Sequence, residues 1–300
     1  APDDVAGGVA SDASGPGAAA RRARVAVPAR ADAPGRVAWA VRRRPVRAAV
    51  GWAIAAVVLG AGVVVGGVAG ADARVQVPAG GRATVTLPDG SVAELNGGTT
   101  LRYPRGFRRW LVRPAPAREV ALDGEAFFRV ARTGRPFVVR TYNARVTVLG
   151  TRFGVRAHDP ADARAGATAV TVEEGRVRVA AAASDATAGD DASAVVLGAG
   201  ERSVVAGTRG LPTAAAPAPV AEVLAWRRGG FAAVDLPLDA VLRALERQYG
   251  GEIVLRAPAA AGDRLTLYYP RPVAVDAILT DVCTARALHF RRTSRGYEVY

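Results

Sequence analysis

The sequence predicts a mainly β protein that ends in a small α+β domain and carries a single transmembrane helix near its N-terminus. Three observations predict this. Apolar residues alternate with polar ones through residues 75–205. After residue 222 the apolar residues recur at the helical spacing of about 3.6 residues, and residues 48–71 carry no charge. Half of the 300 residues are hydrophobic, which suits a chain of about two domains.

Composition excludes several kinds of chemistry. The one cysteine, Cys283, rules out an intramolecular disulfide and a multi-cysteine metal site, and His158 and His289 leave little for metal binding. The net charge of +13 at pH 7 is compatible with an anionic partner such as nucleic acid. However, every basic residue is arginine, and lysine and methionine are absent. We therefore favour a compositional bias over a polyanion-binding role.

The N-terminal quarter predicts a disordered arm followed by a membrane anchor. Residues 1–47 are rich in alanine, arginine and proline with little apolar periodicity, which predicts a disordered arm. Residues 48–71 are 24 consecutive uncharged residues behind several arginines, long enough for a transmembrane helix with the arm on the cytoplasmic side. The alternative is a late signal peptide, since small residues follow the apolar run. We favour the anchor because the run is long and starts far from residue 1.

The region from 75 to 205 predicts an antiparallel β-sandwich or barrel. Val85 and Leu87, a Pro-Asp-Gly turn, and then Ala93 and Leu95 are typical of a hairpin. A second hairpin is predicted around Asp123 and Gly124. Gly150 and Gly154 bracket Phe153, which suggests a bulge or a close backbone approach. Residues 158–168 and 181–193 are expected to be surface loops.

Residues 206–221 predict a semi-rigid Pro/Ala linker, and residues 222–300 a separate C-terminal domain. Apolar residues at helical spacing predict one helix after Pro237 and another that carries Val275 and Cys283. The words LDAVL and VDAIL repeat in these two helices. The domain is thus predicted to be a duplicated βαβ module, with strands near Phe231, Ile253, Leu265 and Phe290 and at 297–300.

Several words of the sequence resemble the FecR family of anti-sigma factors and sigma regulators. AWRRGGF (225–231) and DLPLDAVL (235–242) resemble the start of that family's C-terminal domain, which is similar to the short signalling domains of secretins and TonB-dependent receptors. The resemblance covers roughly residues 46–300. The words in the β-rich region are LPDGSVAELN (87–96), VALDGEAFFRV (120–130), RPFVVRT (135–141), VLGTRFGVRA (148–157) and VEEGRVRV (172–179).

The resemblance implies a single-pass inner-membrane signal transducer with residues 72–300 in the periplasm. Its implied partners are the signalling domain of a TonB-dependent outer-membrane receptor, engaged in ferric siderophore or glycan uptake, and an extracytoplasmic-function sigma factor. The family's helical, tryptophan-containing sigma-binding segment is not found before the membrane span; Trp39 alone is similar to it. Either the N-terminus is truncated or misread, or the chain does not bind a sigma factor directly. A periplasmic, membrane-anchored binding or scaffold module without direct sigma-factor control is therefore the alternative.

No constellation of residues predicts an enzyme, a cofactor or a metal site. Glu173 and Glu174 are neighbours on a strand and point to opposite faces, so we expect one solvated and one turn-forming acid. Cys283 falls on the apolar side of its helix, as a buried thiol would. An arginine cluster that includes Arg118 is interleaved with aromatic residues; a solvated loop is the favoured interpretation, and partner binding the alternative. The candidate partner-binding residues are Arg105, Arg108, Arg109, Trp110, Phe231 and Tyr268.

Overall fold

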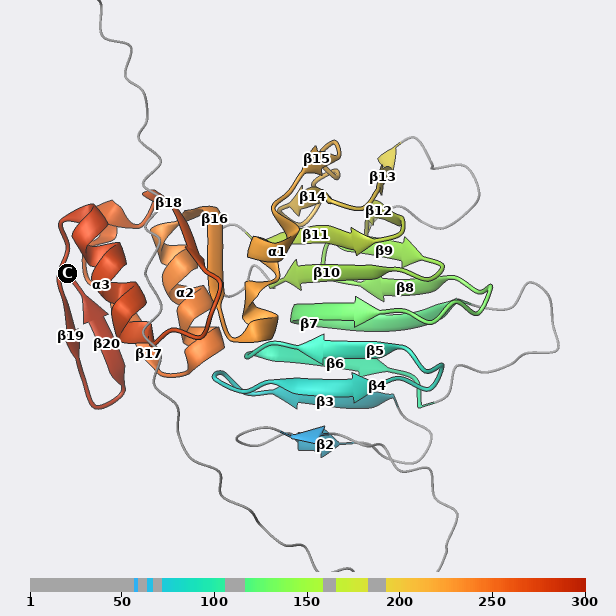
Figure 1. The fold of residues 1–300 in the computed structure, drawn as a ribbon, viewed down its shortest axis with the longest axis horizontal. Helices are drawn as coiled ribbons and strands as arrows, with labels where there is room; N and C mark the ends of the chain where they lie inside the picture. The colour runs from blue at the N-terminus through green and yellow to red at the C-terminus, as the bar shows by residue number, and fades with distance from the viewer. Residues whose placement is uncertain (1–56, 59–63, 67–71, 106–116, 159–165, 183–192) are drawn as a thin grey trace, which may run out of the picture. The chain divides into compact units, whose positions relative to one another are not determined.

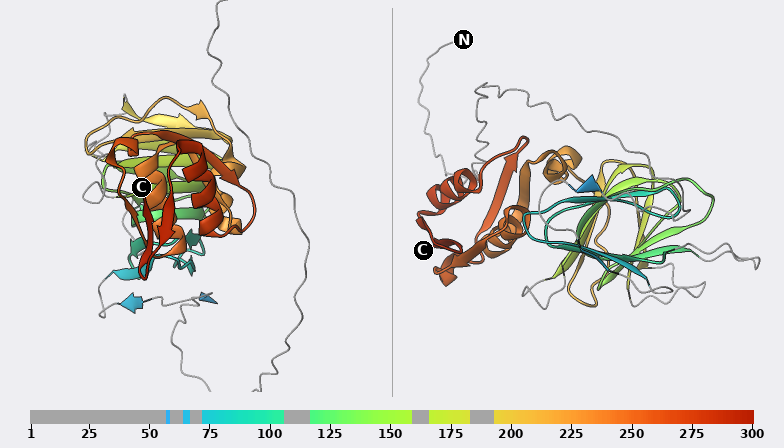
Figure 2. Two further views of the ribbon diagram at one scale, coloured as in Figure 1. Left: turned by 90° about the vertical axis from the view of Figure 1, so that its left-hand side faces the viewer. Right: turned by 90° about the horizontal axis from the view of Figure 1, so that it is seen from below.

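The computed structural model describes residues 57–58, 64–66, 72–105, 117–158, 166–182 and 193–300, all within one compact unit, Trp52–Tyr300. The fold is mainly β with few helices, as predicted. Fifteen strands of the described residues form a sheet that curls into a half-barrel, shown in Figures 1 and 2. A smaller α+β region follows it in the chain (Figure 1).

The curled sheet has two halves that share one long strand, β7 (Arg118–Arg129). Besides β7, the first half holds β4 (Ala83–Thr86), β5 (Val92–Leu95), β10 (Arg152–Ala157), β11 (Ala167–Glu174), β14 (Glu201–Ala206) and β15 (Ala216–Pro217). The second half holds β3 (Ala73–Val77), β6 (Thr99–Tyr103), β8 (Phe137–Arg140), β9 (Ala144–Val148), β12 (Val177–Ala181) and β13 (Val195–Leu197). The described pairings are antiparallel in both halves except for β7 with β8.

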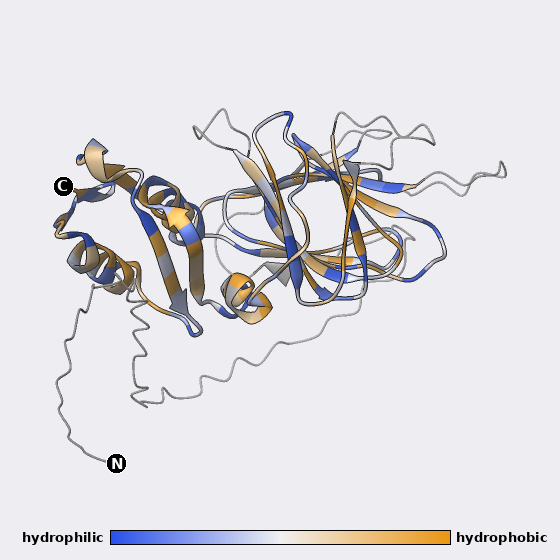
Figure 3. Cartoon of the chain, turned by 90° about the horizontal axis from the view of Figure 1, so that it is seen from above, coloured by the Kyte–Doolittle hydropathy of each residue, from blue (hydrophilic) through white to orange (hydrophobic). Residues whose placement is uncertain are grey.

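The core lies between the two halves and contains mostly valine, alanine and leucine, with three phenylalanine rings. Apolar and polar residues alternate along the strands (Figure 3), so one face of each half is buried. Phe128 is fully buried, and its ring centroid lies 5.4 Å from that of Phe153 and 6.0 Å from that of Phe137. β-branched and aromatic side chains of this kind pack well on a pleated surface.

The first predicted hairpin is confirmed and the second is wrong. β4 and β5 pair antiparallel with Val85 opposite Ala93 around the Pro-Asp-Gly turn. Asp123 and Gly124, however, lie inside the continuous strand β7. Before Gly124 this strand pairs with β6 and β8, and after it with β5 and β10. Gly124 has a φ of 121°, so the glycine bends one strand from one half of the sheet to the other instead of closing a turn.

The predicted membrane span is not confirmed. The structure describes five of its 24 residues, and these form the short strands β1 (Val57–Val58) and β2 (Val64–Gly66), which pair with β4 and β3. Valine, being β-branched, readily adopts this extended form. No helix within the described ranges is long and apolar enough to cross a membrane. The rest of the span and the arm 1–47 lie outside the described residues.

Much of the segment predicted as a linker belongs to the sheet. Residues Ala216–Pro217 form β15, which pairs with β14, and Pro212 forms a β-bridge with Val205. Two helical turns follow, α1 (Val220–Val223) and η3 (Ala225–Arg228). Proline suits an edge strand because it lacks the N–H that a central strand would need.

The C-terminal elements follow the predicted order. Leu238, Val241, Leu242 and Leu245 of the first long helix pack with Ile278, Leu279 and Val282 of the second in one apolar cluster, which also holds the buried Cys283. The elements are β16 (Phe231–Pro237), α2 (Leu238–Tyr249), β17 (Glu252–Leu255), η4 (Pro258–Ala260), β18 (Arg264–Tyr269), α3 (Val275–Arg286), β19 (Phe290–Arg292) and β20 (Gly296–Val299). β16 pairs with β18, and β20 lies between β17 and β19.

Candidate functional site

The outer face of the first half-sheet is covered by the segment 220–228, and this covered face is the candidate site. Strand pairing aligns one residue from each of five strands in a row across it: Glu94, Phe127, Gly154, Thr171 and Arg202. Phe127 is fully buried although it points away from the main core, because it packs with Leu224 and Trp226. The row therefore carries both apolar contacts and charges under one short segment.

Gly154 lets the covering segment approach the sheet backbone. A Cβ built at this position would lie 2.7 Å from Cδ2 of Leu224, well inside van der Waals contact. The structure confirms the predicted close approach, whereas the register shift between Arg152 and Phe153 leaves the extra residue, Glu173, on the neighbouring strand β11. The glycine is thus required by a packing contact across the outer face and not by a turn.

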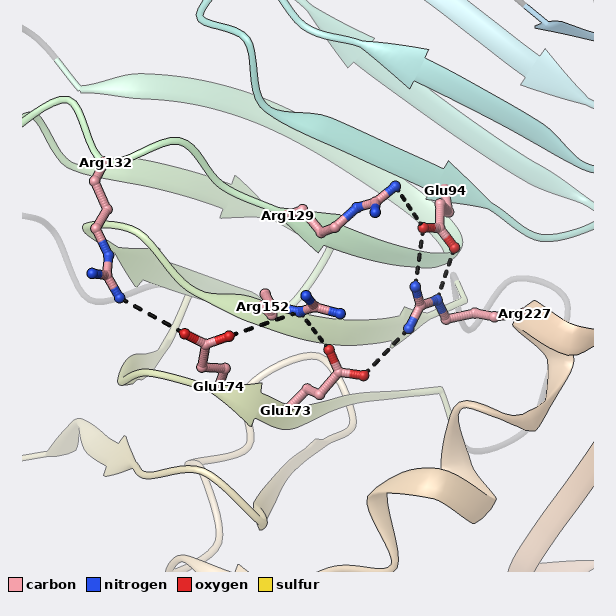
Figure 4. Close-up of polar contacts among 7 residues, drawn as sticks. All are labelled: Glu94, Arg129, Arg132, Arg152, Glu173, Glu174 and Arg227. Atoms are coloured by element: carbon pink, nitrogen blue, oxygen red, sulfur yellow. Dashed lines mark hydrogen bonds and ion pairs between the residues drawn. The ribbon is translucent and has the colours of Figure 1, made fainter.

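Arg227 docks the covering segment by its charge. Its Nε and Nη2 donate to the two carboxylate oxygens of Glu94 at 2.8 and 3.0 Å, and its Nη1 lies 3.4 Å from Oε1 of Glu173 (Figure 4). The guanidinium carbon also lies 3.6 Å from the ring centroid of Phe127. A paired fork on a carboxylate together with a stacked ring is geometry that lysine could not reproduce.

Further arginines extend this contact into a network of seven side chains, shown in Figure 4. Arg129 Nη2 lies 3.1 Å from Glu94 Oε1, and Arg152 Nε lies 2.6 Å from Glu173 Oε2. Glu174 stands further off, with Arg152 at 4.0 Å and Arg132 at 3.9 Å. We define the Arg227 network as these seven residues: Glu94, Arg129, Arg132, Arg152, Glu173, Glu174 and Arg227. Its carboxylates are each shared between two cations.

The structure corrects two predictions about charged residues, one for the pair Glu173 and Glu174 and one for Arg118. Glu174 is largely exposed, as one of the two acids was predicted to be, but Glu173 is only 30% exposed and lies within β11, not in a turn. It is held between Arg152 and Arg227, because the outer face of β11 is covered where it meets η3. Arg118 is also not in a solvated loop. Its side chain is only 1% exposed and donates to Asp89 and to two backbone carbonyl oxygens. These partners come from a turn and a loop that sequence periodicity does not relate.

The structure places the predicted partner-binding residues in different settings. Arg105 is exposed just after β6, whereas Arg108, Arg109 and Trp110 lie outside the described residues. Tyr268 on β18 is 38% exposed. Phe231 lies on the paired strand β16 but is 2% exposed, and its ring lies 6.5 Å from that of Tyr249. Partner binding by these residues stays a prediction, and only Arg105 and Tyr268 present accessible side chains in the described ranges.

The Arg227 network was not predicted from the sequence, although the sequence holds two signals for it. Phe127 is the first ring of an adjacent phenylalanine pair, so one of the two must point away from the core and needs a cover. Arg227 lies within AWRRGGF, the word that marks the approach to the C-terminal region. Neither signal identifies Glu94 or Glu173 as its partners, because 133 and 54 residues separate them from Arg227.

Two hollows lie beside the network under the covering segment. The first, which is partly open to solvent, is lined by Arg156, Thr171, Arg202 and Trp226, among others. The second shares Glu125, Arg156 and Trp226 with the first and adds His158 and Arg247. The pKa of His158 lies well below its ordinary value, mainly because the side chain is buried and also because Arg247, Arg156 and Arg243 are nearby cations. This imidazole is therefore neutral at pH 7.

A half-barrel whose outer face is tied by salt bridges to the start of an α+β region defines a structural class, a β-rich module with an appended α+β region, and not a particular activity. The family model described as FecR protein matches residues 73–178. Two crystal structures of a "putative anti-sigma factor" from Parabacteroides distasonis ATCC 8503, at 2.50 and 1.65 Å resolution, are each 31% identical to this chain with a TM-score of 0.63. They cover 76% of this chain and are themselves covered to 97% and 98%.

The chain therefore belongs to the FecR family. The family resemblance predicted from the sequence is confirmed by both comparisons. No curated protein matches the chain.

Proposed function

We propose that this protein regulates a sigma factor through contacts between proteins. The observation that carries the proposal is the likeness, over 76% of the chain, to crystal structures of a "putative anti-sigma factor". In finer terms, the regulated protein is an extracytoplasmic-function sigma factor, and the input is the signalling domain of a TonB-dependent receptor in siderophore or glycan uptake.

The proposal includes a membrane topology. Residues 48–71 are proposed to anchor the chain in the inner membrane, with residues 1–47 in the cytoplasm and 72–300 in the periplasm. The uncharged run behind several arginines supports this arrangement. Reporter fusions test it: a fluorescent protein at residue 1 and alkaline phosphatase at residue 300 should both be active. Activity of both reporters in one compartment would contradict it.

The Arg227 network supplies a physical basis for passing a signal from the C-terminal region to the sheet. A partner that binds the C-terminal region changes the sigma factor only if its affinity differs between two arrangements of the protein. Arg227 lies on η3, in the short segment between the sheet and β16, and its carboxylate partners lie on β5 and β11. Separation of this contact is therefore a step that partner binding can bias.

A transcription experiment tests sigma-factor regulation. In a strain that lacks the gene, transcripts of each extracytoplasmic-function sigma factor's promoters are measured with and without the wild-type chain. We expect one set of promoters to change. The matched pair Arg227→Gln and Arg228→Gln then tests the role of the network, since Arg228 is exposed and makes no contact in it. Only Arg227→Gln is expected to alter the response to the inducing ligand.

The alternative function is a membrane-anchored binding or scaffold module without sigma-factor control. The departure of residues 1–47 from the family's sigma-binding pattern favours it. Transcripts that stay unchanged for every sigma factor in the deletion strain would establish this alternative and reject regulation. Capture of a receptor signalling domain by the full chain, weakened by Tyr268→Ala, would fit either function and identify the docking surface.

A further inference from the structure

We propose that the hollows under the segment 220–228 form a binding site for a small oxyanion, such as phosphate, sulfate or a small carboxylate. The site is built by Arg156, Arg202, Thr171 and Trp226, with Arg247 in the second hollow. It is separate from the Arg227 network, which has its own carboxylates, and does not depend on the function proposed above.

The charge of the side chains that line the hollows is unbalanced. Arg156, Arg202 and Arg247 line the two hollows, and within the described ranges no ion pair or side-chain hydrogen bond is formed by any of their guanidinium groups. This contrasts with Arg118 and Arg227, whose carboxylates lie within hydrogen-bond distance. A cation that is partly removed from water without a counterion is unfavourable, so the hollow is electrostatically suited to an anion.

The carboxylate available inside the hollows does not balance these three charges. Glu125 lies opposite Arg156 in strand register, yet its Oε2 accepts a hydrogen bond from Asn96 Nδ2 at 2.8 Å. Burial lowers the pKa of Arg247 to about 10, although Glu125 inside the hollows and Glu246 outside their lining both act to raise it. Burial likewise lowers the pKa of Arg202 to about 10. The arginines are therefore still cations at pH 7, against one carboxylate.

Two residues that line the first hollow carry buried donors without acceptors. Trp226 is 4% exposed, and its indole Nε1 is a buried donor with no hydrogen-bond partner in the described part of the chain. Nε of Arg202 is also a buried donor with no hydrogen-bond partner among the described residues. Buried donors are almost always paired in folded proteins. An oxyanion offers several acceptor atoms and would satisfy both donors while it neutralises the arginines.

Strand pairing places these groups side by side on the sheet. Thr171 lies directly opposite both Gly154 on β10 and Arg202 on β14. Leu224 of the covering segment packs over Gly154, and Thr171 and Arg202 line the hollow beside that contact. Arg156 lies two residues along β10 on the same face as Gly154. The donors thus converge from three elements of rigid sheet and one covering segment, as a preorganised site requires.

Calorimetric titration of the full chain in detergent with sodium phosphate, at ionic strength held constant with sodium chloride, tests the site. We expect saturable binding to one site and a rise in melting temperature. Sulfate and acetate in parallel titrations show which oxyanion geometry the site prefers. Binding to Arg202→Gln should be weaker by at least about tenfold, the loss expected for one charge-assisted hydrogen bond. The matched control Arg74→Gln removes an exposed arginine on β3 and should bind as the wild type does.

Several outcomes would overturn the proposal. These are no saturable binding of any of the three anions to the folded wild-type chain, an equal effect of sodium chloride alone, or the same affinity in Arg202→Gln. If circular dichroism shows that Arg202→Gln does not fold, Thr171→Val replaces it, because it removes a hydroxyl group from the same row with almost no change in volume. Unchanged affinity in Thr171→Val would then reject the site. Sigma-factor regulation could still hold in any of these cases.

Discussion

In the β-rich region, polar side chains are buried inside the fold, whereas in the C-terminal region they lie almost entirely on its surface. The β-rich region buries Arg118 and Asn143 completely, and with them several serine and threonine hydroxyl groups. Asn143 donates to the carbonyl oxygens of Val205 and Gly207 and accepts from Thr168. Among the described residues of the C-terminal region, one polar side chain is buried. It is that of Gln248, which donates a hydrogen bond to the carbonyl oxygen of Gly230.

The difference shows how the two regions specify their structures. Strands that are distant in sequence need a device that sets which loop meets which strand, and buried hydrogen bonds to backbone carbonyls do this in the β-rich region. The two amphipathic helices of the C-terminal region need fewer buried hydrogen bonds, because the local periodicity of their apolar residues already fixes which face is buried. Loss of a buried polar group should therefore cost far more stability in the first region than loss of an ion pair in the second.

The largest effect is expected for Arg118→Leu. This change leaves the carboxylate of Asp89, itself 6% exposed, without its cation and removes donors from two backbone carbonyl oxygens. We expect a loss of about 3 to 5 kcal/mol in the free energy of unfolding, measured by urea denaturation. Arg102→Leu, at an exposed position on β6, is the control and should differ little from the wild type.

A double variant sharpens this prediction. In Arg118→Leu with Asp89→Leu, both charges are gone, so the double variant should be more stable than Arg118→Leu alone. If Arg118→Leu itself unfolds at the wild-type urea concentration, the buried pair is not what holds the turn at Asp89 against β7, and the comparison between the two regions fails.

Gly124→Ala should have the next largest effect. Its φ of 121° is strained for any residue with a side chain, and the new Cβ would lie 2.6 Å from Cα of Thr99. We expect a loss of about 2 to 3 kcal/mol in thermal or urea unfolding. Gly90→Ala separates the two causes, because Gly90 has a φ of 83° and nothing within 4 Å of the added Cβ. It should lose only about 1 kcal/mol, and equal losses would mean that the bend in β7 is not crowded.

Elements set by local pattern could be predicted from the sequence. The hairpin around Asp89 and the helices α2 and α3 follow from alternation, helical spacing and turn residues within about a dozen positions. Gly124 shows the limit of such patterns. A glycine between two alternating runs fits a hairpin turn or a bend in one strand equally well, and the choice depends on Thr99, which only the folded sheet brings against it.

The candidate site could not be predicted because it depends on strand order. Glu94, Phe127 and Arg202 form one row only after β5, β7, β10, β11 and β14 have paired in this register. Sequence spacing carries no information on that order. The sequence did predict that Gly154 allows a close approach, but it could not identify Leu224 as the group that approaches.

Arg227→Gln lies between the two regions and should have an intermediate effect. It removes the fork on Glu94 and the contact with the Phe127 ring, but Arg129 and Arg152 continue to neutralise the carboxylates. We therefore expect a loss of about 1 to 2 kcal/mol and faster proteolysis of the segment 206–228. Arg228→Gln is the adjacent control. Equal proteolysis of the two variants would show that the salt bridges do not hold the segment on the sheet.

The smallest effect is expected for Arg264→Ala in the C-terminal region. Arg264 donates from Nε to Asp235 Oδ1 at 2.7 Å, but the two side chains are 56% and 69% exposed, so water and salt screen the pair.

The hydrogen bond from Arg264 lowers the pKa of Asp235. A carboxyl group with a lowered pKa adds stability above its unfolded pKa and loses it as the pH falls through the folded value. The melting temperature at pH 7 should therefore be only slightly below that of the wild type. This small difference should vanish as the pH falls through the folded pKa of Asp235, and 1 M salt, where the screening length is about 3 Å, should remove it. A clear drop at pH 7 that persists in salt would show that the C-terminal region, too, relies on specific polar contacts.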